Sequence, residues 1–486
     1  MLARAITHAL VGLEPRKVEV EAHVRGSPVN PSFAIVGLAD RACQEAKERV
    51  ASAIRSAELF WPEGRLIVNL APAELRKEGS GFDLPIALAL LAASRQIPHD
   101  RLAEHASVGE LALDGRIRRV GGVLAVAEGA RRAGLRELLC PADACGEAAL
   151  AGIEPIPVRH LADAARYLRG ELQLEPYVAT NGTPSPRDGP NLADVRGQER
   201  ARRALELAAA GGHNLLLAGP PGTGKTMLAR RLPAILPPLA DEQAIEVTRI
   251  HSVAGLLDPD HPLTAEPPFR APHHSASTAA IVGGGPRLRP GEASLAHHGI
   301  LLLDELAEFQ RPALEALRQP LEDGVISVAR AAGNVRFPAR FQLVGTMNLC
   351  PCGARGDANA QCTCSAQRLA RYRDKLSRAL LDRFDLVVTM PRPRASELQG
   401  GPGEDSGAIR KRVVAARERL RLPARRTKEA DDLLTRAVER LPLSGRGRAR
   451  VARVAQTIAA LAGSDDVLPE HVAEALSYRR PSELSA

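Results

Sequence analysis

The residues best suited to chemistry form a glycine-rich loop near the middle of the chain. The loop reads Gly219-Pro220-Pro221-Gly222-Thr223-Gly224-Lys225-Thr226, which fits the pattern G-x-x-x-x-G-K-[ST]. The apolar run before it predicts a buried strand, and residues 227–231 predict the start of a helix. In that context backbone N–H groups cradle phosphates, while Lys225 reaches the β and γ phosphates and Thr226 holds Mg²⁺. We therefore expect a nucleoside triphosphate site.

Three later positions could complete this chemistry. Residues 300–305 read Ile-Leu-Leu-Leu-Asp-Glu, an apolar strand that ends in two carboxylates. Asp304 is expected to hold Mg²⁺ through water, and Glu305 to orient and polarise the attacking water. Asn348 ends another apolar strand and could sense the γ-phosphate.

Arg383 lies between acidic residues in Leu-Leu-Asp-Arg-Phe-Asp, after the strand that ends in Asn348. An arginine acting on the active site of a neighbouring subunit can be worth about 10³ to 10⁵ in rate. That role would require an oligomer. The alternative is a surface arginine in a salt bridge.

The order of these motifs resembles the AAA+ ATPases, and the stretch over residues 269–309 resembles the magnesium-chelatase-like branch, in particular the YifB/ComM family. The resemblance covers nearly the whole chain. It implies ATP and Mg²⁺ as cofactors and self-association into a ring, expected to be a hexamer. It also places Val195 and Gly197 near the adenine. Arg446 becomes the candidate for the sensor-2 arginine of the lid, with Arg448 and Arg450 as alternatives.

The N-terminal segment is similar to the catalytic domain of Lon proteases over residues 106–134. Laid over that family's pattern, Gly81 falls at the position of the nucleophilic serine and Leu124 at that of the activating lysine. Because a serine hydroxyl is a poor nucleophile without a base, we expect a non-proteolytic module for oligomerisation or DNA binding. Proteolysis through Ser80 is the alternative.

Two insertions between the predicted strands carry arginines. Residues 326–337 predict a β-hairpin around Gly333 and Asn334, which the resemblance identifies as the pre-sensor-1 hairpin, and residues 283–291 form a basic loop in the helix-2 insert. Arginines on such loops suit contacts to a phosphate backbone without sequence readout. The alternative is exposed arginines without a specific role. The candidate DNA contacts are Arg287, Arg289, Arg330 and Arg336.

Four cysteines lie close together in the sequence after Asn348. They are Cys350, Cys352, Cys362 and Cys364. Four thiolates can bind Zn²⁺ tetrahedrally, although the C-x-C spacing is tighter than the usual C-x₂₋₄-C. Reduced thiols on a polar loop are the alternative. His273 and His274, which are adjacent to each other elsewhere in the sequence, are expected to have a structural role rather than to bind metal.

The composition is that of a globular protein with several domains: 486 residues, 45% hydrophobic and 25% charged. A net charge of +8 favours polyanionic partners. No apolar run reaches the roughly 18 to 20 residues of a membrane span, and the N-terminus does not read as a signal peptide. Seven cysteines, an odd count, favour reduced thiols and a cytoplasmic location without membrane partners.

These elements predict a multidomain chain. We expect an α+β, Lon-like domain of the ribosomal-S5-domain-2-like class at 1–170 and a linker at 171–192. An α/β AAA+ P-loop core with a parallel sheet follows at 193–393, carrying the helix-2 insert and the hairpin. A second linker at 394–407 leads to an all-α lid at 408–486.

The ComM resemblance implies a DNA motor that extends heteroduplex by branch migration during natural transformation. Single-stranded and branched DNA would be its partners. A chelatase-type ATPase that drives metal insertion into a tetrapyrrole is one alternative. A protein-remodelling ATPase is another.

Overall fold

The computed structural model describes residues 1–25, 32–178, 189–285, 288–330, 333–422, 424–441 and 444–479, with the backbone only at 329, 330 and 333. The chain divides into two compact units. The first contains Met1–Thr183 and Asp241–Thr264, and the second contains Pro184–Ala240 and Ala265–Ala486. The segment Asp241–Thr264 thus interrupts the continuous range of 193–393 that the sequence suggests for the core, because it packs with the N-terminal residues.

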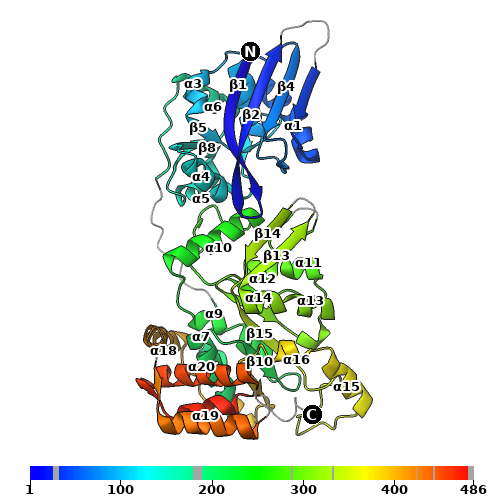
Figure 1. Ribbon diagram of the computed structural model, residues 1–486, viewed down its shortest axis with the longest axis vertical. Coiled ribbons are helices and arrows are strands. Elements are labelled where there is room, and N and C mark those ends of the chain that lie inside the picture. The colour runs from blue at the N-terminus through cyan, green and yellow to red at the C-terminus, as the bar shows by residue number, and fades with distance from the viewer. Residues whose placement is uncertain are drawn as a thin grey trace. The chain divides into compact units, whose positions relative to one another are not determined.

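The first unit is built on a seven-stranded mixed sheet (Figure 1). Its strands in spatial order are β3 (Ser32–Val36), β4 (Arg65–Ala71), β2 (Glu14–Arg25), β1 (Leu2–Val11), β5 (His105–Ser107), β8 (Glu137–Pro141) and β9 (Glu154–Val158). β1 pairs antiparallel with β2, and β2 antiparallel with β4, while the other neighbours run parallel. A two-residue-per-strand ribbon joins β6 (Glu110–Leu111) to β7 (Ile117–Arg118).

The helices of the first unit are α1 (Arg41–Ser56), α2 (Asp83–Ala93), α3 (His99–Ala103), α4 (Val123–Arg132), α5 (Cys145–Ala149), α6 (Leu161–Arg169) and α10 (Asp241–Ala254), with a 3₁₀ turn η1 (Ala142–Ala144). Asp40 caps α1, because its carboxylate accepts the backbone N–H of Cys43 at 2.8 Å. All of α2 is buried, which fits a sequence that is apolar around the helix except for Asp83, whose carboxylate pairs with Arg49.

Helix α10 is held to the first unit by polar contacts. Arg249 Nη2 lies 2.5 Å from a carboxylate oxygen of Glu128 on α4. Ser252 Oγ donates to the buried carboxylate of Glu147, whose charge is balanced by Arg119 Nη2 at 2.9 Å. Arg119 also donates to the carbonyl of Leu257 at 2.9 Å. These bonds explain why the segment belongs with residues far from it in sequence.

The second unit contains a five-stranded parallel sheet, so the predicted α/β core is confirmed. Its strands in spatial order are β11 (Phe269–Arg270), β12 (Ile300–Leu303), β15 (Gln342–Met347), β10 (Leu215–Ala218) and β16 (Leu386–Thr389). β10, β12 and β15 are buried along their whole length. Helices cover both faces of such a sheet, which is why these strands read as continuous apolar runs.

The helical elements around this sheet are short. They are η2 (Leu192–Asp194), α7 (Glu199–Gly211), α8 (Lys225–Ala229), α9 (Leu232–Ile235), α11 (Thr278–Val282), α12 (Glu292–Leu295), η3 (Leu306–Glu308), α13 (Arg311–Ala316), α14 (Arg318–Asp323), α15 (Ala366–Asp374), α16 (Arg378–Leu381) and α17 (Ala395–Leu398). The last of these lies inside the range that the sequence suggested as a second linker.

A β-hairpin stands between α14 and β15, as expected. Its strands are β13 (Val325–Arg330) and β14 (Gly333–Pro338). Gly333 pairs with Arg330 and Asn334 with Ala329, so the prediction that Gly333 and Asn334 form the turn is wrong. Residues 331–332, between the two strands, lie outside the described residues.

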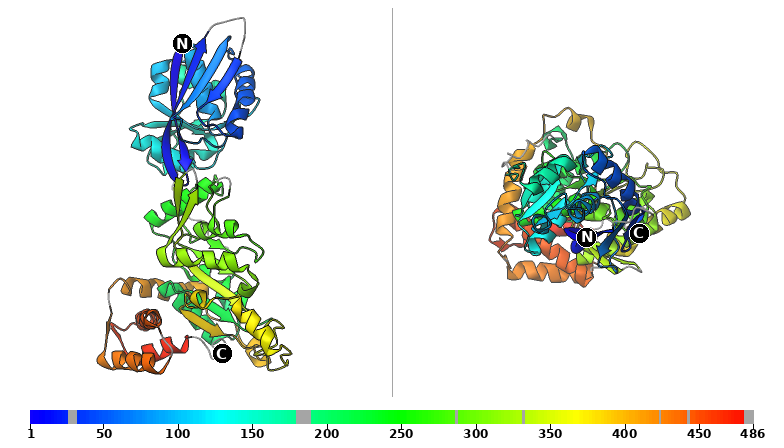
Figure 2. Two further views of the ribbon diagram at one scale, coloured as in Figure 1. Left: turned by 45° about the vertical axis from the view of Figure 1, so that its right-hand side comes forward. Right: turned by 90° about the horizontal axis from the view of Figure 1, so that it is seen from above.

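The C-terminal lid contains four helices, α18 (Ser406–Arg419), α19 (Lys428–Arg440), α20 (Gly445–Ala462) and α21 (Pro469–Ser477), seen in orange to red in Figure 2. It also contains a short parallel pair, β17 (Arg425–Arg426) with β18 (Asp466–Val467), so it is not purely helical. α18 and α20 both pack on α7. No helix in the described ranges is long and apolar enough to cross a bilayer.

Candidate functional site

The phosphate loop leaves the carboxyl end of β10, which lies between β15 and β16. Gly222 and Gly224 have φ of +77° and +87°, a region that favours glycine, and α8 begins directly afterwards at Lys225. A Cβ on Gly219 would lie 2.3 Å from the carbonyl oxygen of Met390, so no larger residue fits there. A Cβ on Gly222 would meet no atom within 4 Å. The loop is therefore packed at its base and open at its tip.

Lys225 lies at the floor of this loop. Its Nζ donates to the carbonyl oxygens of Gly219 at 2.8 Å and Pro220 at 2.7 Å, and to Oδ1 of Asn348 at 3.2 Å. Burial lowers the pKa of the Lys225 ammonium, and the carboxylates that follow β12 oppose that shift. The lysine thus links the loop after β10 to the amide after β15, as a γ-phosphate sensor would require.

A hydroxyl and carboxylate cluster lies beside the lysine. Thr226 Oγ1 donates to Oδ1 of Asp304 at 2.8 Å, and Thr346 Oγ1 donates to the same oxygen. Thr346 Oγ1 also accepts the backbone N–H of Glu305 at 3.1 Å. Oxygen ligands of this kind suit Mg²⁺, so Thr226 and Asp304 fit the predicted metal role. The role of Thr346 was not predicted, because a threonine in a strand carries no distinctive sequence signal.

Glu305 presents its carboxylate outward from the end of β12. Its backbone has φ of +54°, an uncommon value for a residue with a Cβ, and its side chain is 60% exposed. His274 Nδ1 lies 3.5 Å from Oε2 of Glu305. His274, which was expected to be structural, therefore contacts Glu305, the candidate water activator. The two residues are far apart in the sequence, so the contact could not be predicted from it.

The segment expected near the adenine adjoins the phosphate loop. Val195 is buried and Gly197 has φ of +65°. The next residue, Gln198, donates through Nε2 to the carbonyl of Pro391 at 2.7 Å and of Thr223 at 3.4 Å. Gln198, the last residue of the predicted segment, thus ties that segment to the phosphate loop.

The two candidate arginines from outside the loop meet on one carboxylate. Arg383 Nη2 pairs with Glu322 on α14, and Arg446 Nη1 lies 2.9 Å from Oε1 of the same residue. The Arg383 side chain is only 7% exposed and also donates to the carbonyl of Ala379 at 3.0 Å. The Arg446 side chain is 68% exposed. For Arg383 to reach a neighbouring subunit, its pair with Glu322 would have to open.

The alternative lid arginines are placed differently. Arg448 is exposed. Arg450 is buried, with Nε 3.6 Å from Oδ1 of Asp385, and Oδ2 of Asp385 accepts the backbone N–H of Asn214 at 3.0 Å. Arg450 therefore helps to join helix α20 to the start of β10 and β16, which is a structural contact.

The candidate DNA contacts are only partly described. Arg287 lies outside the described residues, as does the side chain of Arg330. Arg289 and Arg336 are both exposed, and Arg336 pairs with Ser327 across the hairpin, on the face opposite to the buried Val335 and Phe337. Both side chains are therefore available to a phosphate backbone.

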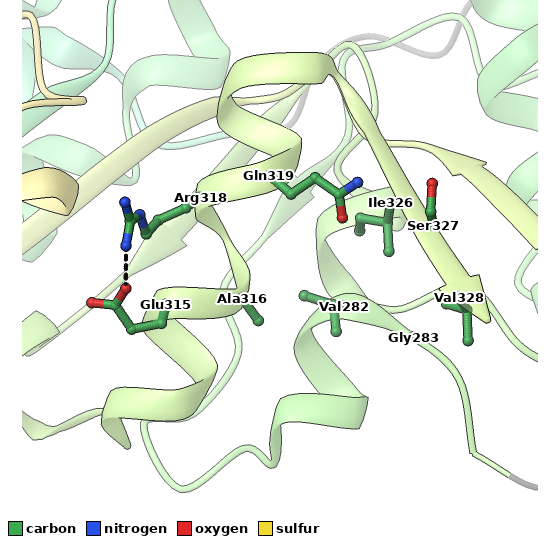
Figure 3. A pocket seen from close by; sticks show the side chains of 9 residues that line it. All are labelled: Val282, Gly283, Glu315, Ala316, Arg318, Gln319, Ile326, Ser327 and Val328. Carbon is green, nitrogen blue, oxygen red and sulfur yellow. Dashed lines mark hydrogen bonds and ion pairs between the residues drawn. The ribbon is translucent and has the colours of Figure 1, made fainter. Parts of the chain in front are cut away.

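A groove of about 560 Å³ separates the hairpin from α11 and α13 (Figure 3). Val282, Ile326 and Val328 line it with apolar groups. Its cation, Arg318, is 2.9 Å from Oε2 of Glu315, so the pair presents little net charge. Of the candidate DNA contacts whose side chains are described, neither Arg289 nor Arg336 lines this groove.

The four cysteines, hereafter the cysteine cluster, lie close together in the structure. Their Sγ atoms all lie within 4.8 Å of one another. A hydrogen bond from the backbone N–H of Ala354 is the main reason that the pKa of Cys352 is lowered to about 6. The cluster is therefore suited to holding a thiolate near neutral pH.

Comparison with known families agrees with this geometry. Three magnesium-chelatase models match the chain. They are magnesium chelatase, subunit ChlI, over residues 191–398, subunit ChlI of Mg-chelatase over 20–144, and the ChlI C-terminal model over 403–479.

Full-length relatives give the same result. An uncharacterised protein of Mycobacterium tuberculosis is 45% identical over 99% of both chains. The uncharacterised protein YifB of Escherichia coli is 42% identical over 97% of this chain and 96% of its own. The competence protein ComM of Haemophilus influenzae is 41% identical over 98% of this chain and 97% of its own. The chain belongs to the YifB/ComM family of magnesium-chelatase-like AAA+ proteins.

Proposed function

We propose that this protein is an ATP-hydrolysing ring motor that acts on DNA, with a ComM-like role in branch migration during natural transformation. One observation carries the ATPase part: Lys225, Asp304 and Asn348 converge from the ends of three neighbouring strands. Ligands bind at such strand ends in open α/β sheets. The fit of the open glycine loop to phosphates supports ATP as the substrate.

The residues divide the work of hydrolysis among them. The loop and Lys225 would bind the phosphates, and Thr226 with Asp304 would hold Mg²⁺, which neutralises phosphate charge when bound. Glu305 would orient and polarise the attacking water. Asn348, whose side chain accepts a hydrogen bond from Lys225, would also contact the γ-phosphate.

Arg383 and Arg446 would complete the ATP site only after their ion pairs with Glu322 break. We propose that Arg383 acts on the neighbouring subunit of a hexameric ring and that Arg446 serves as sensor 2. Because both arginines pair with the carboxylate of Glu322, the same carboxylate would hold both away from the nucleotide.

DNA as the substrate of the motor is supported by charge. The chain carries a net charge of +8, and Arg289 and Arg336 are exposed. Aromatic residues make up only 3%, so contacts to phosphates rather than base stacking would dominate, and binding would be sensitive to salt. None of the seven cysteines, all of which are among the described residues, forms a disulfide, which supports the proposed cytoplasmic location.

The first unit would serve as a non-proteolytic, Lon-like module for oligomerisation or DNA binding. Gly81 and Leu124 stand where the resemblance places a catalytic serine and lysine. Ser80 Oγ donates to the carboxylate of Glu110 rather than to a lysine. A carboxylate here could fix the hydroxyl, but the activating lysine of a Lon-type dyad is absent from the position that would hold it.

The decisive experiment measures ATP turnover with and without single-stranded and branched DNA. Lys225→Ala is the blank, since it removes the ammonium that the loop provides. We expect DNA to stimulate turnover strongly at low salt and weakly at high salt, with no stimulation in the blank. A branch-migration assay on a four-way junction then tests the motor directly.

A chelatase-type ATPase is the second candidate, favoured by the three family models named for magnesium chelatase. In that case hydrolysis would drive metal insertion into a tetrapyrrole by a partner protein. Robust turnover that is indifferent to DNA at low salt would contradict the DNA motor and support this alternative or a protein-remodelling role.

A further inference from the structure

The cysteine cluster has the dimensions of a metal site. The Sγ atoms of Cys350 and Cys352 are 3.3 Å apart, those of Cys352 and Cys362 are 3.6 Å apart, and those of Cys350 and Cys362 are 3.7 Å apart. With Zn–S bonds of about 2.3 Å, the edges of a regular tetrahedron of sulfur atoms are roughly 3.8 Å long. The observed separations are close to this value, whereas unrelated thiols have no reason to converge from two segments.

The loop around the cluster is shaped to hold the sulfur atoms. Gly353 and Gly356 have φ of +79° and +81°, which lets the chain fold back immediately after the first pair of cysteines. The backbone N–H of Arg355 donates to Sγ of Cys350 at 3.3 Å. Hydrogen bonds of this kind orient the ligands of a metal and stabilise their charge. Cys352 is exposed, which gives an ion a path into the site.

The same loop touches the nucleotide site on two sides. Asn348, which contacts Lys225, is two residues from Cys350, and its carbonyl accepts the hydroxyl of Tyr372 at 3.1 Å. Tyr372 belongs to α15, the helix that follows the last cysteine. On the other side, a Cβ on Gly353 would lie 2.7 Å from Cγ of Pro221 in the phosphate loop. The loop that carries the cluster therefore contacts both the sensor residue Asn348 and the phosphate loop.

We propose that the cysteine cluster binds one Zn²⁺ and that the resulting loop fixes Asn348 and the phosphate loop in their working positions. The metal site stands on the sulfur geometry alone. Its effect on turnover rests on the proposed ATPase function. Zn²⁺ here is structural, because all four thiolates are protein ligands and a closed tetrahedron leaves no coordination position for water.

Metal analysis of the full-length protein tests the site without reference to activity. The protein, purified under reducing conditions with trace Zn²⁺, is expected to contain one zinc per chain by plasma mass spectrometry. Cys352→Ser with Cys364→Ser is expected to lose it. Cys145→Ala, which removes a buried thiol of the first unit, should keep one zinc per chain. Wild-type protein without zinc, or a double variant with undiminished zinc, would overturn the proposal.

A thiol count separates zinc from disulfides in the same place. After denaturation with a chelator and no reductant, a zinc site releases all seven thiols of the chain. Two disulfides within the cluster would leave three, that is, seven minus the four cysteines of the cluster. A count near three in freshly purified protein would contradict the metal site.

Turnover then tests the link to the nucleotide site. Removal of zinc with a zinc-selective chelator in excess Mg²⁺ should lower ATP turnover by about 10- to 100-fold, and added Zn²⁺ should restore it. This is the usual effect of losing a group that positions the residues of a site without touching the substrate. Unchanged turnover in zinc-free protein would refute the positioning role. One zinc per chain without turnover under any condition would leave the site intact and refute the ATPase instead.

Discussion

The strand ends of the second unit and the loop at Gly81 in the first unit are both places where family resemblance expects catalytic side chains. In the second unit each expected polar group has a polar neighbour: Lys225 bonds to Asn348, and Thr226 to Asp304. In the first unit, a Cβ on Gly81 would instead lie 3.5 Å from Cγ2 of Val108, and Leu124 is fully buried.

The two regions differ in whether the expected catalytic positions hold polar side chains that are bonded to one another. A buried polar group costs free energy unless it has a partner, so the groups of the second unit persist as a bonded set. At the corresponding positions of the first unit, Gly81 and Leu124, the surroundings are apolar instead. The two units therefore predict opposite responses to substitution.

The largest effect is expected for Arg383. Arg383→Ala should lower ATP turnover on the order of 10³-fold or more, because a transition-state charge would lose its partner. Nucleotide affinity, measured with a fluorescent ATP analogue, should stay close to that of the wild type.

Mixing experiments determine whether this arginine acts between subunits. Rings that combine Arg383→Ala chains with Glu305→Gln chains should regain part of the turnover, because some interfaces then contain both intact residues. If no mixture regains turnover, Arg383 does not act across subunits, and its pair with Glu322 is its main role.

A somewhat smaller loss is expected when the water activator is removed. Glu305→Gln should reduce turnover by roughly 10² to 10⁴-fold, the usual contribution of a general base, while ATP binding persists. Ser80→Ala is the matched change in the first unit and should leave both turnover and any peptidase signal at the wild-type level. Peptide hydrolysis by the wild type that Ser80→Ala abolishes would show that the first unit retains a protease site.

The sequence predicted the parts whose backbone shape or burial is set locally. The phosphate loop requires glycines at its left-handed positions, Gly222 and Gly224, so its place in the chain could be predicted from the residue pattern. The pairing of Glu322 with both Arg383 and Arg446, and the attachment of Asp241–Thr264 to the first unit, could not be predicted from the sequence. Periodicity shows that a face is buried, yet it does not show which distant residues cover it.

A moderate effect is expected for the Thr346 hydroxyl, which joins the Asp304 carboxylate to the backbone N–H of Glu305. Thr346→Val removes the donor to Asp304 and the acceptor for the N–H of Glu305, with little change in volume. The Mg²⁺ concentration for half-maximal turnover should rise by about 10- to 100-fold. Thr435→Val, on an exposed turn of α19, is the control and should not change it. An unaltered Mg²⁺ requirement in Thr346→Val would mean that Asp304 is positioned without this bond.

The smallest effect concerns pH and separates the stability of the two units. Burial lowers the pKa of His213 to about 4, with Asp385 opposing the shift and Arg453 adding to it. The unfolded chain therefore binds more protons than the folded one between about pH 6.5 and 4, and stability is lost as pH falls through this window. The loss attributable to His213 should be on the order of 2 to 3 kcal/mol.

His213→Gln should flatten this dependence in the second unit alone. Hydrogen exchange of peptides from β10 and β16 reports that unit, while the single tryptophan, Trp61, reports the first unit by fluorescence. The first unit has its own buried histidine, His8, whose pKa burial also lowers to about 4, so its acid response should be unchanged by the substitution. If His213→Gln left the pH slope of β10 and β16 as steep as in the wild type, protonation of carboxylates rather than of this histidine would control acid unfolding of the second unit.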